Sequence, residues 1–80
     1  MLRTLVMTER LVIEDRTFAI RYFELRTVRG ALRYSAEIAL GPDDRVILDD
    51  DSMPTLRARA ARLVPATLYS RELAGRATAA

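Results

Sequence analysis

Residues 17–41 read TFAIRYFELRTVRGALRYSAEIALG, and this stretch decides the fold because it holds two strand-like runs on either side of a turn signal. The turn signal is Arg29-Gly30, since glycine suits a loop position with positive φ. A two-residue loop at this point places Val28 opposite Ala31 and continues the pairing outward along both runs. The sequence therefore predicts one long antiparallel β-hairpin.

The predicted pairing divides the side chains of this hairpin between two faces. One face is almost wholly apolar, and we expect it to form the core. The expected core residues are Phe23, Leu25, Tyr34, Ile38 and Leu40 on the hairpin, and Leu56, Leu63 and Leu73 beyond it. On the other face, Arg26 is expected opposite Arg33. A slip of one residue would mix the two sets, so burial of one face favours this register or one two residues away.

The segments around the hairpin add further elements. Residues 3–14 contain two aliphatic clusters, which predict two short strands or one bent strand, although the spacing within residues 1–8 also fits a helical turn. Residues 45–49 follow a Gly-Pro turn signal and predict another short strand. Ser52 or Asp51 suits the N-terminal cap of a helix, which Pro65 is expected to interrupt. A second helix is expected to begin at this proline and to end at Gly75.

Strands followed by helices predict an α+β fold. We expect an antiparallel sheet of four to five strands with one face covered by a C-terminal helical pair. With 80 residues, half of them hydrophobic, the chain is expected to form a single small domain over residues 1–80. A domain of this size has a modest core and often gains stability from a partner.

The composition argues against metal and cofactor chemistry. The sequence contains no cysteine or histidine, so the usual zinc and haem ligand sets cannot be built. Five aspartates lie within residues 43–51, but a turn and a helix N-terminus give them a sufficient role. We therefore expect no metal and no cofactor.

The sequence also argues against an enzyme. Serine, threonine and tyrosine hydroxyls are present, but no histidine or lysine is available to activate them. The formal net charge is +2, and all 13 basic residues are arginine. No apolar run is long enough to span a bilayer, and the first eight residues are too short an apolar run for a signal peptide. A cytoplasmic, bacterial-type protein with no membrane association is expected.

Binding of single-stranded nucleic acid is one function that the hairpin suggests. Arg26, Arg29 and Arg33 cluster near the predicted turn, and Tyr22 is expected on the same sheet face. Arginines beside an aromatic residue can bind a single strand through phosphate contacts and base stacking. The order of strands followed by helix is also similar to that of the Whirly-type single-strand DNA binders, a resemblance of layout.

Self-association is the function that we favour from the sequence. In the predicted register Phe18, Ile20 and Tyr22 point away from the core face, so the first half of their strand is apolar on both sides. Such a strand needs cover on both faces. Either residues 3–14 fold over it, or a second copy of the chain supplies the cover. The second copy is favoured, which predicts a homodimer with these three residues at its interface.

Overall fold

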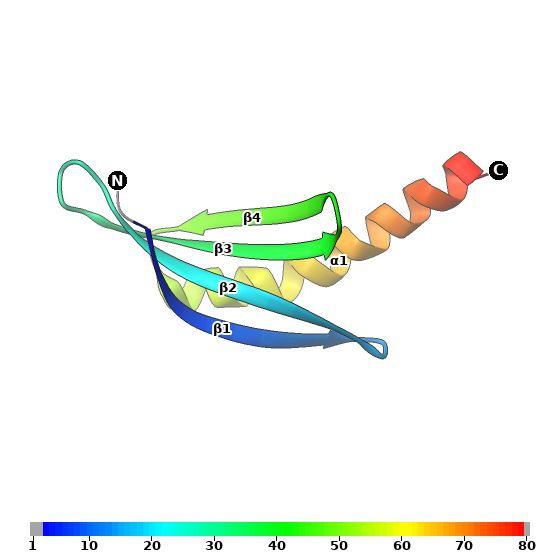
Figure 1. The fold of residues 1–80 in the computed structure, drawn as a ribbon, viewed down its shortest axis with the longest axis horizontal. Coiled ribbons are helices and arrows are strands. Elements are labelled where there is room, and N and C mark those ends of the chain that lie inside the picture. The colour runs from blue at the N-terminus through cyan, green and yellow to red at the C-terminus, as the bar shows by residue number, and fades with distance from the viewer. Residues whose placement is uncertain (1–2, 80) are drawn as a thin grey trace.

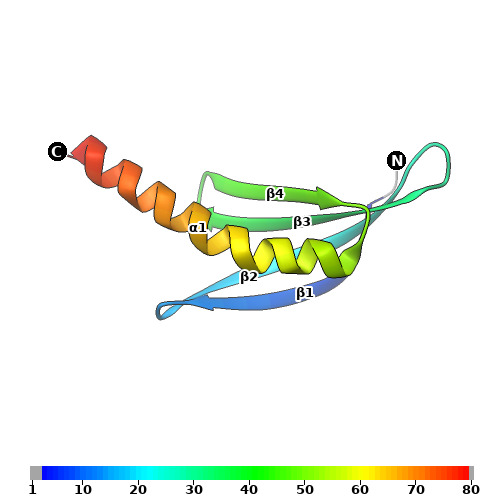
Figure 2. The same cartoon turned by 180° about the vertical axis from the view of Figure 1, so that it is seen from behind.

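The computed structural model describes residues 3–79 and shows an α+β domain (Figure 1). Its elements in chain order are β1 (Arg3–Ile13), β2 (Arg16–Arg26), β3 (Leu32–Gly41), β4 (Asp44–Asp50) and α1 (Met53–Ala79). Each strand pairs antiparallel with the next one, so the sheet has the order β1-β2-β3-β4. Helix α1 covers one face of this sheet (Figure 2). The predicted fold class is confirmed, with one helix in place of the predicted pair.

The hairpin of β2 and β3 forms where the sequence predicts it, but its register is shifted by one residue. Tyr22 pairs with Ala36, whereas the two-residue loop would place Phe23 opposite Ala36. The predicted register is therefore wrong, and every β2 side chain is on the opposite face from the one expected relative to β3.

The loop between β2 and β3 explains the shift. Thr27 and Ala31 are the pair of residues that closes the loop, and the Thr27 N–H donates to the Ala31 carbonyl at 2.9 Å. The Gly30 N–H donates to the Thr27 carbonyl at 2.9 Å, and Gly30 has a φ of 83°. The loop is thus three residues long, a tight turn followed by a glycine in the left-handed region. Gly30 therefore supplies the positive φ at the third position of a three-residue loop, whereas the prediction placed it at the second position of a two-residue loop.

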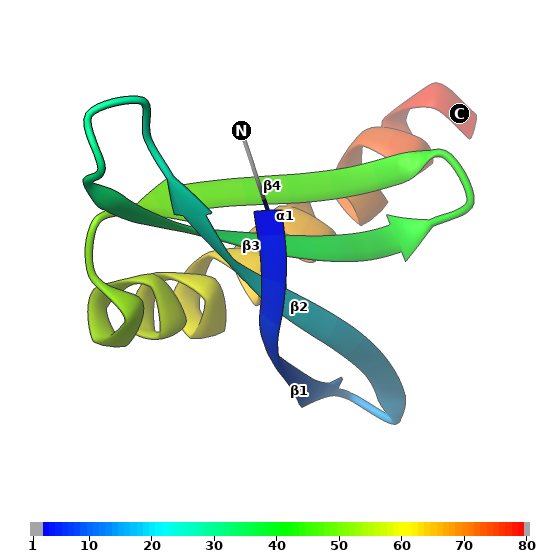
Figure 3. The ribbon, with the colours of Figure 1, turned by 60° about the vertical axis from the view of Figure 1, so that its left-hand side comes forward.

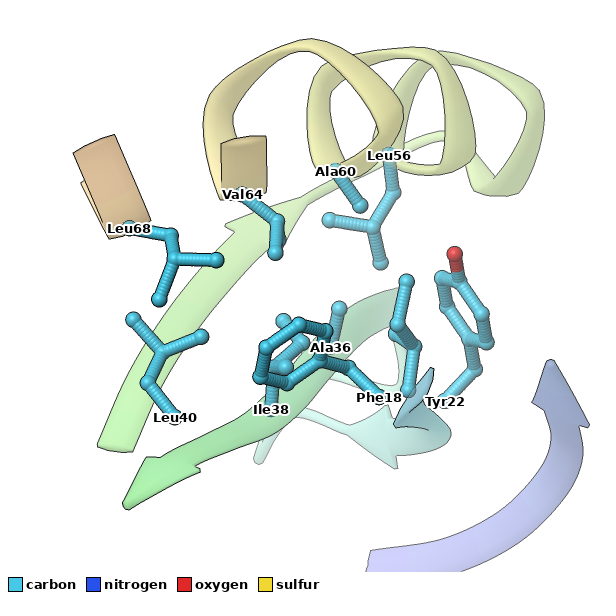
Figure 4. Packing of buried hydrophobic residues seen from close by; sticks show 10 residues of the cluster. Phe18, Tyr22, Ala36, Ile38, Leu40, Leu56, Ala60, Val64 and Leu68 are labelled. Atoms are coloured by element: carbon cyan, nitrogen blue, oxygen red, sulfur yellow. The ribbon is translucent and has the colours of Figure 1, made fainter. Parts of the chain in front are cut away.

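The shifted register changes which residues fill the core. The sheet face under α1 is lined by alternate residues of all four strands, and Figure 4 shows those of β2 and β3 against the helix. The buried cluster consists of Phe18, Ile20, Tyr22, Ala36, Ile38, Leu40, Leu56, Ala60, Val64 and Leu68. The core prediction is right for Ile38, Leu40 and Leu56, and for Tyr34, which packs against the cluster. It is wrong for the other four, because Phe23 and Leu25 point to the opposite sheet face and Leu63 and Leu73 lie outside the cluster.

We call the sheet face turned away from α1 the outer face. Its charged and large side chains are Arg3, Leu5, Arg10, Arg21, Phe23, Leu25, Arg33, Glu37, Arg45, Ile47 and Asp49. The sheet is strongly twisted, so that β1 crosses the direction of β3 and β4 (Figure 3). Residues 3–13 form one strand with an irregularity between Leu5 and Met7, which agrees with the predicted bent strand.

Helix α1 begins at Met53, and Ser52 caps it, which is one of the two predicted caps. The Ser52 Oγ accepts a hydrogen bond from the Thr55 N–H at 3.4 Å, and its carbonyl accepts one from the Leu56 N–H at 2.9 Å. The predicted break at Pro65 is wrong, because the helix continues through the proline to Ala79. A proline inside a helix costs about 3 kcal/mol, but Val64 and Leu68 on either side of it are buried against the sheet. Tertiary packing therefore keeps the helix continuous.

The C-terminal part of α1 runs past the end of the sheet (Figure 1). A helix of 27 residues is about 40 Å long at 1.5 Å per residue, and the molecule accordingly measures 50 × 22 × 20 Å. Two ion pairs tie this part of the helix to the strands: Arg71 to Asp44 and Glu72 to Arg16, both at 3.0 Å. Among residues 3–79, no helix combines the length and apolar character needed to cross a membrane.

Candidate functional site

The residues predicted to bind nucleic acid do not come together. Arg26 pairs with Leu32 while Arg33 pairs with Leu25, so the two arginines point to opposite faces of the hairpin. Arg26 instead donates from Nη1 to the Gly30 carbonyl at 3.2 Å, within the loop that also holds Arg29. The arginine and tyrosine face that the sequence predicts is therefore not assembled.

Phe18, Ile20 and Tyr22 lie in the core instead of on an open face (Figure 4). Helix α1 covers all three, and Tyr22 is fully buried. Met7, Leu11 and Ile13 of β1 also pack against the cluster that contains them. The sequence argument that placed these three residues on an uncovered face therefore no longer applies. Tyr22 is equally unavailable for stacking on a base.

Tyr22 belongs to a polar network beneath the N-terminal half of α1. Its hydroxyl donates to Glu9 Oε1 at 3.0 Å, and Arg57 donates to Glu9 Oε2 at 2.5 Å. The hydrogen bond from Arg57 lowers the pKa of Glu9. Burial first, and the hydrogen bond to Glu9 second, raise the pKa of Tyr22 from 10.0 to about 12. This network satisfies a buried hydroxyl and joins β1, β2 and α1.

Tyr22→Phe tests this network, because it removes the hydroxyl and keeps the ring. A raised pKa in the folded state stabilises the fold fully below pH 10, and this contribution is lost as the pH rises through about 12. The substitution should cost about 1 kcal/mol at neutral pH and should flatten the fall in stability across that alkaline range. Urea unfolding at pH 8 and pH 11 measures both effects, with Tyr69→Phe at an exposed site as control. Equal alkaline sensitivity in both variants would contradict the network.

The outer face carries a cluster that the sequence did not reveal, and we call it the arginine cluster: Arg3, Arg21 and Arg45 around Glu37. Arg3 contacts Glu37 Oε2 at 2.6 Å, and Arg21 and Arg45 contact Oε1 at 3.1 and 2.7 Å. The four residues come from β1, β2, β3 and β4, with Glu37 on the third strand. Glu37 is only 5% exposed, whereas the three arginine side chains are 43%, 50% and 60% exposed. Three cations thus surround one buried carboxylate on an open sheet face.

The ring of Phe23 supports this cluster from below. The Arg3 guanidinium carbon lies over the ring at 3.7 Å from its centroid, and that of Arg21 at 5.6 Å. Such contacts attract a cation to the face of the ring. Phe23 is 8% exposed although α1 lies on the other side of the sheet, which shows that the arginines cover it. Each of the two arginines is therefore held by both a carboxylate and a ring.

The electrostatics of the arginine cluster leave it positively charged. The hydrogen bond from Arg3, followed by the charges of Arg45, Arg3 and Arg21, lowers the pKa of Glu37 against the opposing effect of burial. Glu37 therefore stays ionised at neutral pH, and three positive charges against one negative charge leave an excess of two. Arg10, Arg33 and Asp49 also lie on the outer face. The described strand residues of that face include five arginines and two acids, so its formal charge is +3.

The projecting end of α1 is a second exposed feature. Tyr69 and Leu73 are 61% and 43% exposed there. They are four residues apart, so they share one face of the helix. Arg71 and Glu72 on the neighbouring faces are engaged with Asp44 and Arg16. Tyr69 and Leu73 thus form a small apolar patch on this part of the helix, which two ion pairs hold in position and which is open to solvent.

Within residues 3–79, no group of three or more acids, histidines or cysteines is placed to ligate a metal ion. Comparison with known proteins adds no assignment: no family model, curated protein or solved structure matches this chain. The function must therefore be argued from the two open surfaces themselves.

Proposed function

We propose that this chain is a small interaction domain that self-associates as a homodimer through the projecting end of α1. The observation that carries the proposal is an excess of exposed surface. The chain exposes 5723 Å² at a mass of 9.0 kDa, whereas a compact monomer of this mass exposes about 4900 Å². The difference of about 800 Å² matches the area that each partner buries in a standard protein interface.

The shape of the molecule locates this excess. The radius of gyration is 14.3 Å, against about 12 Å for a compact domain of 80 residues. The end of α1 that extends past the sheet contributes to the elongation at one end of the molecule, and the loop between β2 and β3 contributes at the other (Figure 1). Docking of another helix along Tyr69 and Leu73 would cover these side chains and restore a compact shape.

Charge favours a second copy of the chain at the helix end and disfavours one at the outer face. Tyr69 and Leu73 are uncharged, so two copies related by a two-fold axis can bring these residues together without repulsion. Two outer faces brought together would place two surfaces with a formal charge of +3 against each other, and these surfaces would repel. A chain with so small a core also gains most from sharing apolar surface with its own copy.

Leu73→Glu is expected to convert a dimer into a folded monomer. The exposed position keeps the substitution from disturbing the core of one copy, but it places two carboxylates at the two-fold interface. Light scattering at micromolar concentration should give twice the 9.0 kDa chain mass for the wild type and the single mass for the variant. Ile47→Glu on the outer face is the matched control and should remain dimeric.

Circular dichroism would verify that both variants keep their secondary structure. A wild-type chain that stays monomeric at high micromolar concentration would refute self-association. A dimer that Ile47→Glu disrupts and Leu73→Glu does not would move the interface to the outer face.

A further inference from the structure

The arginine cluster has more positive charge and more hydrogen-bond donors than Glu37 can use. A guanidinium carries five N–H donors, and the contacts of Arg3, Arg21 and Arg45 with Glu37 each involve one guanidinium nitrogen. About half of each arginine side chain is open to solvent. Donors that point outward from an excess of two positive charges are suited to an anion.

The arginines are also held in place before any ligand arrives. Glu37 is fixed in the middle of the sheet, on β3, and Phe23 holds Arg3 and Arg21 from below. Holding a side chain in its bound geometry lowers the conformational entropy that binding would otherwise cost. The buried carboxylate therefore acts as a positioning residue for three anion-binding groups.

Apolar side chains lie on the same face beside these charges. Leu5 pairs across β1 and β2 with Phe23 and is 52% exposed, and Ile47 pairs across β3 and β4 with Glu37 and is 57% exposed. A ligand that fits must bring negative charges for the arginines and flat apolar groups for Leu5 and Ile47. A single-stranded nucleic acid has both, in its phosphates and in its unpaired bases.

Arg3 offers a stacking surface for such a base. One side of its guanidinium lies over the Phe23 ring at 3.7 Å, and the side chain is still 43% exposed. Nucleic-acid bases stack on the planes of arginine guanidinium groups as well as on aromatic rings. The bases of a duplex are already stacked and paired, so a duplex would contact only the charged groups of the arginine cluster.

We infer that the outer face binds single-stranded nucleic acid, with Arg3, Arg21 and Arg45 contacting phosphates and with Leu5, Ile47 and the guanidinium of Arg3 contacting bases. This site replaces the arginines of the hairpin loop as the nucleic-acid surface. It lies on the face of the sheet opposite α1, so it does not depend on the proposed dimer.

Fluorescence anisotropy with a labelled 12-nucleotide oligothymidylate tests the site. Three phosphate contacts predict an affinity that falls about 20-fold between 50 and 200 mM salt. Arg45→Gln, at the most exposed of the three positions, should weaken binding at least tenfold and reduce the salt dependence by one contact. Arg62→Gln removes the same charge from an exposed position on α1 and should leave affinity nearly unchanged.

Two further probes separate a nucleic-acid site from a general anion patch. Ile47→Ser should weaken binding of the oligonucleotide several-fold without changing binding of inorganic phosphate, since it removes a base contact only. A duplex of the same length and poly-glutamate should both bind at least tenfold more weakly than the single strand. Equal binding of poly-glutamate would overturn the proposal in favour of an acidic protein partner. Absence of binding at 50 mM salt, or equal effects of Arg45→Gln and Arg62→Gln, would also overturn it.

Discussion

Ile38→Ala is expected to lower the free energy of unfolding by about 2–5 kcal/mol, the usual cost of deleting most of a fully buried aliphatic side chain. Ile38 is 0% exposed and sits at the centre of the buried cluster between the sheet and α1. It pairs with Ile20 on β2 and with Val46 on β4, so its loss leaves a cavity bounded by three strands. Urea unfolding followed by circular dichroism measures the change.

Leu25→Ala is the control that distinguishes the observed register from the predicted one. With a two-residue loop, Leu25 and Ile38 would share the core face and their truncation would cost similar amounts. In the structure Leu25 lies on the outer face and is only partly buried, so the same change should cost less than half as much as Ile38→Ala. Equal losses would show that the register is the one with the shorter loop.

Glu37→Ala is expected to destabilise the fold by about 1.5–3 kcal/mol, the usual contribution of a hydrogen bond to a charged group. The variant leaves Arg3, Arg21 and Arg45 close together without their shared carboxylate, but each stays about half exposed and can be hydrated. The loss should be larger than that for Asp44→Ala, which breaks one ion pair between partly exposed groups. Equal losses would mean that the arginine cluster contributes no more to stability than one partly exposed ion pair.

The pH dependence provides an independent check on Glu37. Its pKa in the folded state is lowered from 4.5, chiefly by the hydrogen bond from Arg3. A lowered pKa contributes stability that is present above about pH 4.5 and is lost as the pH falls through the folded value. The stability difference between wild type and Glu37→Ala should therefore be largest at neutral pH and shrink in acid. A constant difference down to pH 3 would contradict this role.

The position of the central hairpin could be predicted from the sequence, but its register could not. Alternating apolar residues and Gly30 locate two strands and a turn, and they are compatible with loops of two or three residues. One residue of loop length decides whether Phe23 or Tyr22 faces the core, and both are large aromatic residues. Because β2 is apolar on both sides, hydrophobic pattern alone did not separate the two registers.

The predicted break of the helix at Pro65 was wrong for a different reason. Proline is a reliable breaker in an isolated helix, but Pro65 lies between Val64 and Leu68, which both pack on the sheet. The free energy gained from this burial offsets the local cost, and that gain depends on a tertiary surface which the local sequence does not reveal.

The arginine cluster was missed because it depends on the register and on the full order of strands. Arg21 lies directly opposite Glu37 only when the loop has three residues. Arg3 and Arg45 are 42 positions apart in the chain. They reach the same carboxylate from β1 and β4, the strands that flank the hairpin on either side. The detectable signal was Glu37 itself, an acid in an otherwise uncharged run from Tyr34 to Leu40. Such a residue needs a cation, and arginine was the only kind available.

The order β1-β2-β3-β4 also bears on how this chain folds. Every pairing in the sheet joins neighbours in sequence, through a two-residue turn at Glu14 and Asp15 and short loops elsewhere. Short loops close quickly, and isolated hairpins form in about 1–10 μs. The chain topology therefore imposes only a low free-energy barrier on formation of the sheet. Two of the contacts that α1 makes join residues 48 and 56 positions apart, Arg57 with Glu9 and Glu72 with Arg16. We therefore expect hairpins to form during synthesis, with α1 docking last, once the C-terminal residues have left the ribosome.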